Sequence, residues 1–209
     1  MTEHNGSGTS ADSDPRPVGR DEVVQATIRA AAELFAQRNP SQVSVREIAT
    51  RAGVSHALVH RYLGTKDDIF RAALALDRQE AADYWINDHG MGRTAGTFEE
   101  DLPPGRYIRT IMRASLDGVP MSAADMKFPH ADKMLEFLRS TEFPSVEDAP
   151  GFDVRLLFSA VTAMAAGMAI AEEFFLVQSG LEDDDREQTR AELNRLIMRI
   201  MTLADRSNV

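Results

Sequence analysis

The residues best suited to chemistry in this 209-residue chain lie close together, between positions 55 and 66. His56 and His60 carry ring nitrogens that donate or accept hydrogen bonds, and Arg61 carries a guanidinium group. On a helix, these three side chains and Ala57 can share one outward side, where they are free to enter a DNA major groove. The two histidines also have the spacing of metal ligands, but no third ligand is near them, so no metal site is expected.

Two short helix patterns meet at Gly53 and would position these residues. Ser44 and Glu47 have the spacing of a capping box that starts the first helix, and Ser55 can cap the second. Gly53 supplies the positive φ that a tight turn between two helices requires. The pairs Val43–Ile48 and Val54–Val59 have the spacing of hydrophobic staples. Together these features predict a helix-turn-helix, a motif that reads DNA with its second helix.

The segment VSVREIATRAGVSHALVHRYLGTKDDI, residues 43–69, resembles the DNA-binding domain of TetR-type (tetracycline-repressor-like) regulators. Three positions depart from the usual pattern of that family. His60 stands where the family usually has Tyr, Leu63 where it usually has Phe, and Gly64 directly precedes the Thr-Lys pair. The motif covers about 27 residues and the resembling domain about 65 of 209. The residues that fit the pattern are Ser44, Ile48, Ala49, Ala52, Gly53, Val54, Ser55, Val59, Tyr62, Thr65, Lys66 and Ile69.

The resemblance implies an all-α fold, with an N-terminal three-helix helix-turn-helix domain joined to a larger helical ligand-binding and dimerisation body. It implies a sequence-specific DNA-binding transcriptional regulator, a repressor released by a small apolar effector. Its partners would be an inverted-repeat DNA operator, the effector and a second copy in a homodimer. A ligand-binding or interaction protein of the same fold without specific DNA binding remains the alternative. The expected DNA-binding residues are Ser44, Arg46, Ser55, His56, Ala57, His60, Arg61, Tyr62, Thr65 and Lys66.

Two of these residues have a second interpretation. Lys66 lies in the first turn of a helix, where backbone N–H groups and the helix dipole favour a phosphate. It can equally pair with Asp67 or Asp68 in solvent. Arg46 can contact DNA at the start of the first motif helix, or it can be an ordinary surface arginine.

Helical spacing of apolar residues organises the rest of the chain. We expect one helix over residues 20–38 before the motif, and a fourth from Thr65 to about Asn87 with a capping box at Thr65 and Asp68. Further helices are expected over residues 106–116, 132–138, 153–179 and 184–204. We divide the chain into a disordered tail (1–17), the helix-turn-helix domain (18–66) and an effector-binding and dimerisation domain (67–209). The tail is either without function or a DNA-binding arm that uses Arg16 and Arg20.

The body is rich in Met and Phe, and its last two helices differ from each other. The first of them has a face of small residues, whereas the second has an apolar stripe. These faces suit a four-helix dimer interface, although packing within one chain can explain a single stripe. The resemblance implies an effector pocket in the body, walled by Trp85, Met112, Leu116, Met134, Phe137, Phe158 and Met164. The expected dimer interface comprises Ala163, Ala166, Ile170, Leu193, Ile197 and Ile200.

The net charge of −10 is unevenly distributed. Residues 15–80 hold ten Lys or Arg against eight Asp or Glu, whereas residues 81–209 hold thirteen against twenty-two. DNA affinity depends on local cations, so the acidic body does not argue against a DNA-binding motif domain. The absence of cysteine excludes disulfides and thiolate metal sites and fits a cytoplasmic protein. The longest apolar run, residues 160–170, is too short to span a membrane. No enzyme motif is present, and no cofactor is expected.

Overall fold

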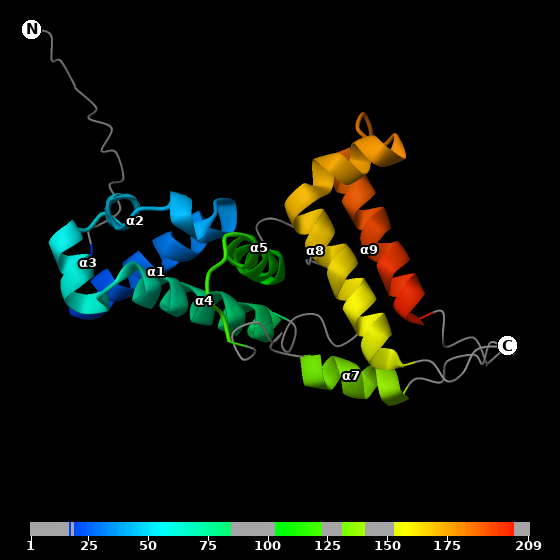
Figure 1. Cartoon of the computed structure of the whole chain (residues 1–209), viewed down its shortest axis with the longest axis horizontal. Helices are drawn as coiled ribbons and strands as arrows, with labels where there is room; N and C mark the ends of the chain where they lie inside the picture. Colours follow the sequence, from blue (N-terminus) through cyan, green and yellow to red (C-terminus); the bar gives the residue numbers. More distant parts are fainter. Residues whose placement is uncertain (1–16, 18, 85–102, 123–130, 141–152, 203–209) are drawn as a thin grey trace, which may run out of the picture.

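The computed structural model describes residue 17 and residues 19–84, 103–122, 131–140 and 153–202. Within these ranges the chain is helical, without a strand (Figure 1). The all-α fold expected from the sequence is therefore confirmed. The elements are α1 (Arg20–Gln37), the 3-10 turn η1 (Pro40–Gln42), α2 (Val45–Arg51), α3 (His56–Leu63), α4 (Lys66–Asp83), α5 (Pro103–Leu116), α7 (Ala131–Ser140), α8 (Val154–Ser179) and α9 (Arg186–Thr202).

The head of the molecule, residues 19–66, is built around one face of α1. Phe35 is fully buried, and its ring meets that of Phe70 edge to face, with the centroids 5.2 Å apart. Ile48 of α2 and Val59 of α3 are also fully buried in this core. Because α2 and α3 are short, this shared apolar contact, rather than their own length, holds them in place. The helix-turn-helix therefore rests on α1 as a rigid base.

Helix α4 extends from the head into the body and packs along α5 (Figure 1). The hydrophobic core is continuous across the expected boundary at residue 66, because Ile69 and Ala73 of α4 join it to Tyr107 of α5. The division at that residue stays a prediction, and the apolar packing shows no break there. A movement of α4 would consequently displace head and body side chains together.

A buried polar cluster joins α4 to α5 inside this packing. The carboxylate of Asp77 is fully buried and accepts hydrogen bonds from Arg106 Nε at 2.5 Å and Thr110 Oγ1 at 3.0 Å. Arg106 also binds Glu80. Burial raises the pKa of Asp77, and the Arg106 guanidinium opposes that shift. Because a buried carboxylate is tolerated only when it is paired, this cluster fixes the register of the two helices.

The end of α5 also holds the head directly. Arg113 Nε donates to the carbonyl oxygen of Ala36 at 3.0 Å. Asp117 accepts hydrogen bonds from the backbone N–H and the hydroxyl of Ser41, both at 2.6 Å, and these bonds lower the pKa of its carboxyl group. The head is thus attached to the body by α5 as well as by α4.

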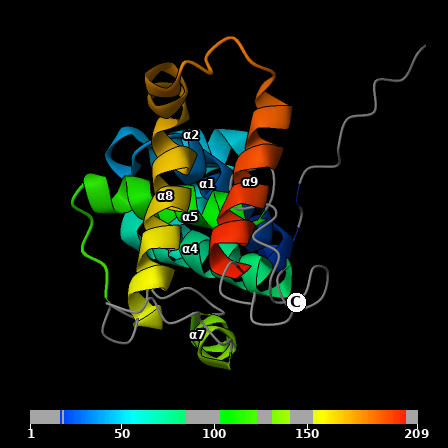
Figure 2. The ribbon, with the colours of Figure 1, turned by 90° about the vertical axis from the view of Figure 1, so that its right-hand side faces the viewer.

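The helices α8 and α9 run side by side on the far side of α5 from the head (Figure 2). Helix α8 bends at Ala171, which has non-helical backbone angles, and ends at Gly180 with φ +68°. One stretch of it, Phe158–Ser179, is long and apolar enough to cross a membrane by length and composition, and most of that stretch is not buried in the chain. The apolar part of this helix is thus longer than the run expected at residues 160–170.

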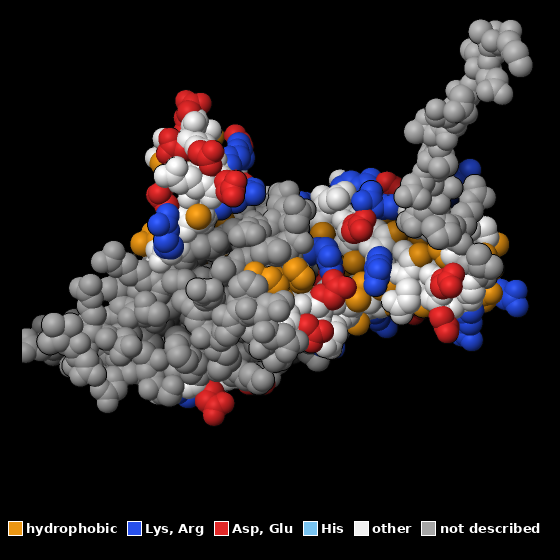
Figure 3. All heavy atoms as spheres, turned by 180° about the vertical axis from the view of Figure 1, so that it is seen from behind, with side chains coloured by type: hydrophobic (Ala, Val, Ile, Leu, Met, Phe, Trp, Pro, Cys, Tyr) orange, Lys and Arg blue, Asp and Glu red, His pale blue; other side chains and the backbone are white. Residues whose placement is uncertain are grey.

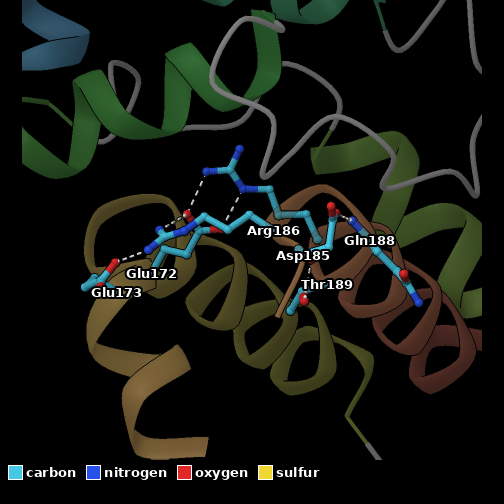
Figure 4. Close-up of polar contacts among 7 residues, drawn as sticks. Glu172, Glu173, Asp185, Arg186, Gln188 and Thr189 are labelled. Atoms are coloured by element: carbon cyan, nitrogen blue, oxygen red, sulfur yellow. Dashed lines mark hydrogen bonds and ion pairs between the residues drawn. The ribbon is translucent and has the colours of Figure 1, made fainter. Parts of the chain in front are cut away.

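Ion pairs close the end of the α8–α9 pair, as Figure 4 shows. Arg186 binds Glu173 and lies 3.7 Å from Glu172, while Arg190 Nε binds Glu172 at 2.5 Å. Asp185 accepts the backbone N–H of Gln188 at 2.8 Å and so caps the start of α9. The paired acids of α8 are therefore structural partners of arginines on α9.

Candidate DNA-binding interface

The two helices of the motif start as the sequence predicts. The Ser44 hydroxyl accepts the backbone N–H of Glu47 at 3.2 Å, and the Ser55 hydroxyl accepts that of Leu58 at 3.4 Å. Gly53, between them, has φ +68°. The second half of the Ser44 capping box was predicted wrongly. The Glu47 carboxylate binds Arg38 at the end of α1, and this hydrogen bond lowers its pKa.

The outward side of α3 carries the four residues expected there. His56, Ala57, His60 and Arg61 are exposed, while Val59 is fully buried beneath them. Tyr62 is half-buried at the edge of this surface. The guanidinium groups of Arg20 and Arg61 lie 5.8 Å and 5.7 Å from the centroid of the Tyr62 ring, within the range of cation–π contacts.

The two histidines form a hydrogen-bonded chain along this surface. His60 Nδ1 lies 3.1 Å from the carbonyl oxygen of Gly64, and His60 Nε2 lies 3.2 Å from His56 Nε2. The ring planes are at 80° and their centroids are 4.4 Å apart. No group of three potential metal ligands occurs among the described residues. The sequence analysis recognised both histidines and their spacing but did not predict their contact. The available signal was Gly64, one helical turn after His60, whose carbonyl oxygen holds the His60 ring in place.

The start of α4 completes the surface. Thr65 and Asp68 form both halves of the predicted capping box: the Thr65 hydroxyl accepts the backbone N–H of Asp68 at 3.2 Å, and Asp68 accepts that of Thr65 at 2.8 Å. Within the described ranges, no carboxylate lies at ion-pair distance from Lys66, Arg46 or Arg61. These three cations are therefore available to an external anion. Blue Lys and Arg side chains project at the head end of the molecule, with acidic side chains between them (Figure 3).

Comparison with known proteins agrees with this geometry. The family model described as "Bacterial regulatory proteins, tetR family" matches residues 28–73, the segment that holds the helix-turn-helix. An HTH-type transcriptional repressor of Mycobacterium tuberculosis is 29% identical over 192 residues, which cover 88% of this chain and 92% of the relative. An HTH-type transcriptional regulator of Mycobacterium bovis matches with the same identity and coverage.

The expected likeness to TetR-type regulators is thus confirmed, and residues 28–73 are a DNA-binding domain of that family. The chain is therefore a DNA-binding regulator and not an enzyme. The fold agrees with a solved TetR-family regulator from Streptomyces coelicolor, with a TM-score of 0.58 at 24% identity over 90% of this chain and 82% of that one.

Four of the seven expected effector-pocket residues have described side chains, and these four differ in exposure. Leu116 is 70% exposed, whereas Met112 and Phe158 are half-buried. Met164 lies on a different surface, the α8–α9 groove described below. Trp85 lies outside the described residues, and the side chains of Met134 and Phe137 are likewise outside what the structure describes. The effector pocket therefore stays a prediction.

Two of the hollows that described residues form differ in chemistry. One, of about 480 Å³, lies between α1, the end of α2 and α5 and has a strongly polar wall. The other, also of about 480 Å³, is an open apolar groove on α8 and α9. Four arginines contribute to the first, namely Arg51, Arg106, Arg109 and Arg113. The groove is lined by Ala163, Met164, Gly167, Met168, Phe175, Ser179 and Leu193.

Two of the six expected dimer residues line that apolar groove. Ala163 and Leu193 line it, and Ile170 is half-buried on the same helix. Ala166 is only 6% exposed, so it packs within the chain and is not available to a partner. The side chains of Ile197 and Ile200 lie outside the described residues.

Proposed function

We propose that α3 is the recognition helix of a dimeric repressor and that it enters the major groove of operator DNA. The observation that carries the proposal is the capped, outward-facing side of α3, with His56, Ala57, His60 and Arg61 exposed above a buried Val59. Base edges would be read from this side. Phosphates on either side would be bound by Ser44, Arg46, Ser55, Tyr62, Thr65 and Lys66, several of which lie at helix starts.

Removing Arg61 and removing Lys66 should have different effects on DNA binding. Arg61→Ala should weaken binding to the preferred operator by about 1–3 kcal/mol and relax the preference for that sequence. Lys66→Ala should weaken binding to all duplexes about equally, because a phosphate contact carries no base information, and should lower the salt slope by about one. Both effects can be measured by fluorescence anisotropy across a salt series, with an operator selected from random duplexes.

Arg51→Ala is the matched control for this experiment. It removes the same kind of cation from the head, but Arg51 is held by Glu33 through a hydrogen bond of 2.7 Å. Operator affinity should therefore stay within about two-fold of wild type. Unchanged operator binding by both the Arg61 and Lys66 variants would refute this placement of the DNA.

We propose further that two copies bind through α8 and α9, which makes the operator an inverted repeat with half-sites in successive major grooves. The exposed apolar residues of these two helices support this assembly. A regulator of this kind shares a compartment with its DNA, which places it in the cytoplasm. Repression, rather than activation, is supported by the family likeness.

Release of the operator by a small apolar effector can be tested through the fluorescence of Trp85, the only tryptophan. It follows closely on α4, whose movement would displace the head, so a small apolar molecule bound in the body should alter its environment. We expect a panel of such molecules to contain one that changes Trp85 fluorescence over the concentration range in which it releases operator. Release of operator without any fluorescence change would contradict this route, and Trp85→Phe controls for the origin of the signal.

A further inference from the structure

The hydrogen-bonded chain on α3 fixes where its protons lie. A carbonyl oxygen only accepts hydrogen bonds, so the contact of 3.1 Å between His60 Nδ1 and the Gly64 carbonyl requires the proton on His60 Nδ1. In a neutral imidazole the other nitrogen then has a lone pair and no hydrogen. His60 Nε2 can therefore only accept at its contact of 3.2 Å with His56. His56 must donate there, from Nε2.

This arrangement determines whether the exposed ring nitrogen of His56 donates or accepts a hydrogen bond. With its proton on Nε2 and directed at His60, the neutral His56 ring keeps a lone pair on Nδ1. Among the described residues, none is hydrogen-bonded to His56 Nδ1, and the side chain is exposed at the first position of α3. The N-terminal residues of a recognition helix are those that meet base edges. Nδ1 is thus the polar atom with which His56 can read a base.

We propose that His60 is a positioning residue that makes His56 a hydrogen-bond acceptor, so that the base read by His56 is adenine or cytosine. In the major groove only adenine N6 and cytosine N4 present amino donors, whereas guanine and thymine present acceptors. A lone pair on His56 Nδ1 fits the first two bases and is repelled by the carbonyl oxygens of the others. The inference rests on the proposed entry of α3 into the groove.

Gly64 is part of the same hydrogen-bonded chain as His60 and His56. Its φ of +83° turns the chain out of α3, and its carbonyl oxygen accepts a hydrogen bond from His60 Nδ1. A Cβ atom at this position would lie 2.7 Å from Asp68 Oδ2, the oxygen that accepts the Thr65 N–H in the capping box. Glycine is therefore required where the carbonyl meets His60. Two of the three unusual residues of this motif, at positions 60 and 64, are linked by one hydrogen bond.

Substitutions at position 60 can reverse the direction of the hydrogen bond between residue 60 and His56. Lysine has hydrogen-bond donors and no acceptor, so His60→Lys should donate to His56 Nε2 and move the proton of His56 to Nδ1. His56 would then read guanine or thymine. Glutamate is an acceptor only, so His60→Glu should keep the preference for adenine or cytosine while weakening binding to every duplex. His60→Ala should leave His56 free to adopt either tautomer and so reduce the preference.

The test is a selection of operators from random duplexes with the full-length protein, followed by affinities for duplexes carrying each base pair at one position. That position is the one at which His56→Ala loses discrimination. We expect wild type to prefer adenine or cytosine there by about five-fold or more, and His60→Lys to prefer guanine or thymine. A merely structural role of His60 would lower affinity without exchanging the preferred bases.

The outcomes separate this inference from the proposed function. A wild-type preference for guanine or thymine at the His56-dependent position would overturn the inference and leave α3 as the recognition helix. An unchanged preference in His60→Lys would do the same. If neither His56→Ala nor Arg61→Ala altered the preference at any position, the placement of α3 in the groove would fail, and the inference would fall with it.

Discussion

Replacing Asp77 with Ala should lower the free energy of unfolding by about 3–5 kcal/mol, the cost of removing one partner from a buried ion pair. Asp77 is fully buried and binds both Arg106 and Thr110 on α5. Its loss leaves the half-buried Arg106 with Glu80 as its remaining carboxylate and leaves the Thr110 hydroxyl without its acceptor. The whole stability of a protein of this kind is about 5–15 kcal/mol, so a large share would be lost.

Urea unfolding followed by circular dichroism measures this effect, with two variants for comparison. Thr110→Val removes one hydrogen bond and keeps the ion pair, so it should cost only about 1 kcal/mol. The double substitution Asp77→Leu with Arg106→Met replaces the charges by apolar groups and should recover much of the loss. A stability of Asp77→Ala within 1 kcal/mol of wild type would show that the cluster does not join the two helices.

The helix starts could be predicted from the sequence because a cap acts over three or four residues. Ser44, Ser55 and Thr65 each bind the backbone N–H that their spacing indicates. Glu47 was assigned wrongly for a related reason. Its carboxylate had a local partner at Ser44 and a distant one in Arg38, and a charged guanidinium is the stronger donor. Local patterns do not reveal such competition across the fold.

The buried cluster was also absent from the sequence reasoning, although a signal for it existed. Asp77 falls on the apolar face of α4 at helical spacing from Ala73, Leu74 and Ala81, all of which are buried. A charged residue on a buried face needs a partner, and this condition predicts an ion pair without identifying it. The partner, Arg106, is 29 residues away on another helix, and only the packing of α4 against α5 selects it. The contact between His56 and His60 is a similar case, because the spacing of the two residues can be read from the sequence but the geometry of their contact cannot.

The effector pocket could not be located by composition. Met and Phe fill irregular apolar space wherever it occurs, in a core, a cavity or an interface. Met164 illustrates this, because it was assigned to the pocket and lines the groove on α8 and α9. Spacing did bring together two residues expected at the dimer interface, because Ala163 and Leu193 line this same groove. The interface itself stays a prediction.

The second large effect is expected from Leu196→Glu, which should convert the protein from a dimer to a monomer and abolish specific operator binding. Six of the seven exposed large apolar side chains among the described residues lie on α8 and α9. Leu196 is one of them, 51% exposed, so a carboxylate there is solvated in the single chain but would be desolvated against a partner. Ala166 is unsuitable for this purpose, because a charge at a residue buried within the chain would disturb the fold itself.

Loss of the dimer should affect DNA binding strongly because the two half-sites are bound as one unit. A dimer holds its second recognition helix at the second half-site as soon as the first is bound, an advantage of about 10²–10⁴ in affinity. A monomer has only one set of contacts and loses that factor. Sedimentation velocity at micromolar concentration reports the assembly, and anisotropy with the selected operator reports the binding. Circular dichroism of the variant should remain that of wild type.

Leu116→Glu is the matched control, since it adds the same charge at an even more exposed leucine, 70% accessible, outside α8 and α9 at the end of α5. It should remain a dimer and bind operator as wild type does. If both variants became monomers, the effect would follow from added acidic charge and not from this face. If Leu196→Glu stayed a dimer with wild-type operator affinity, the two copies would have to meet elsewhere. The exposed apolar side chains of α8 and α9 would then need a different partner.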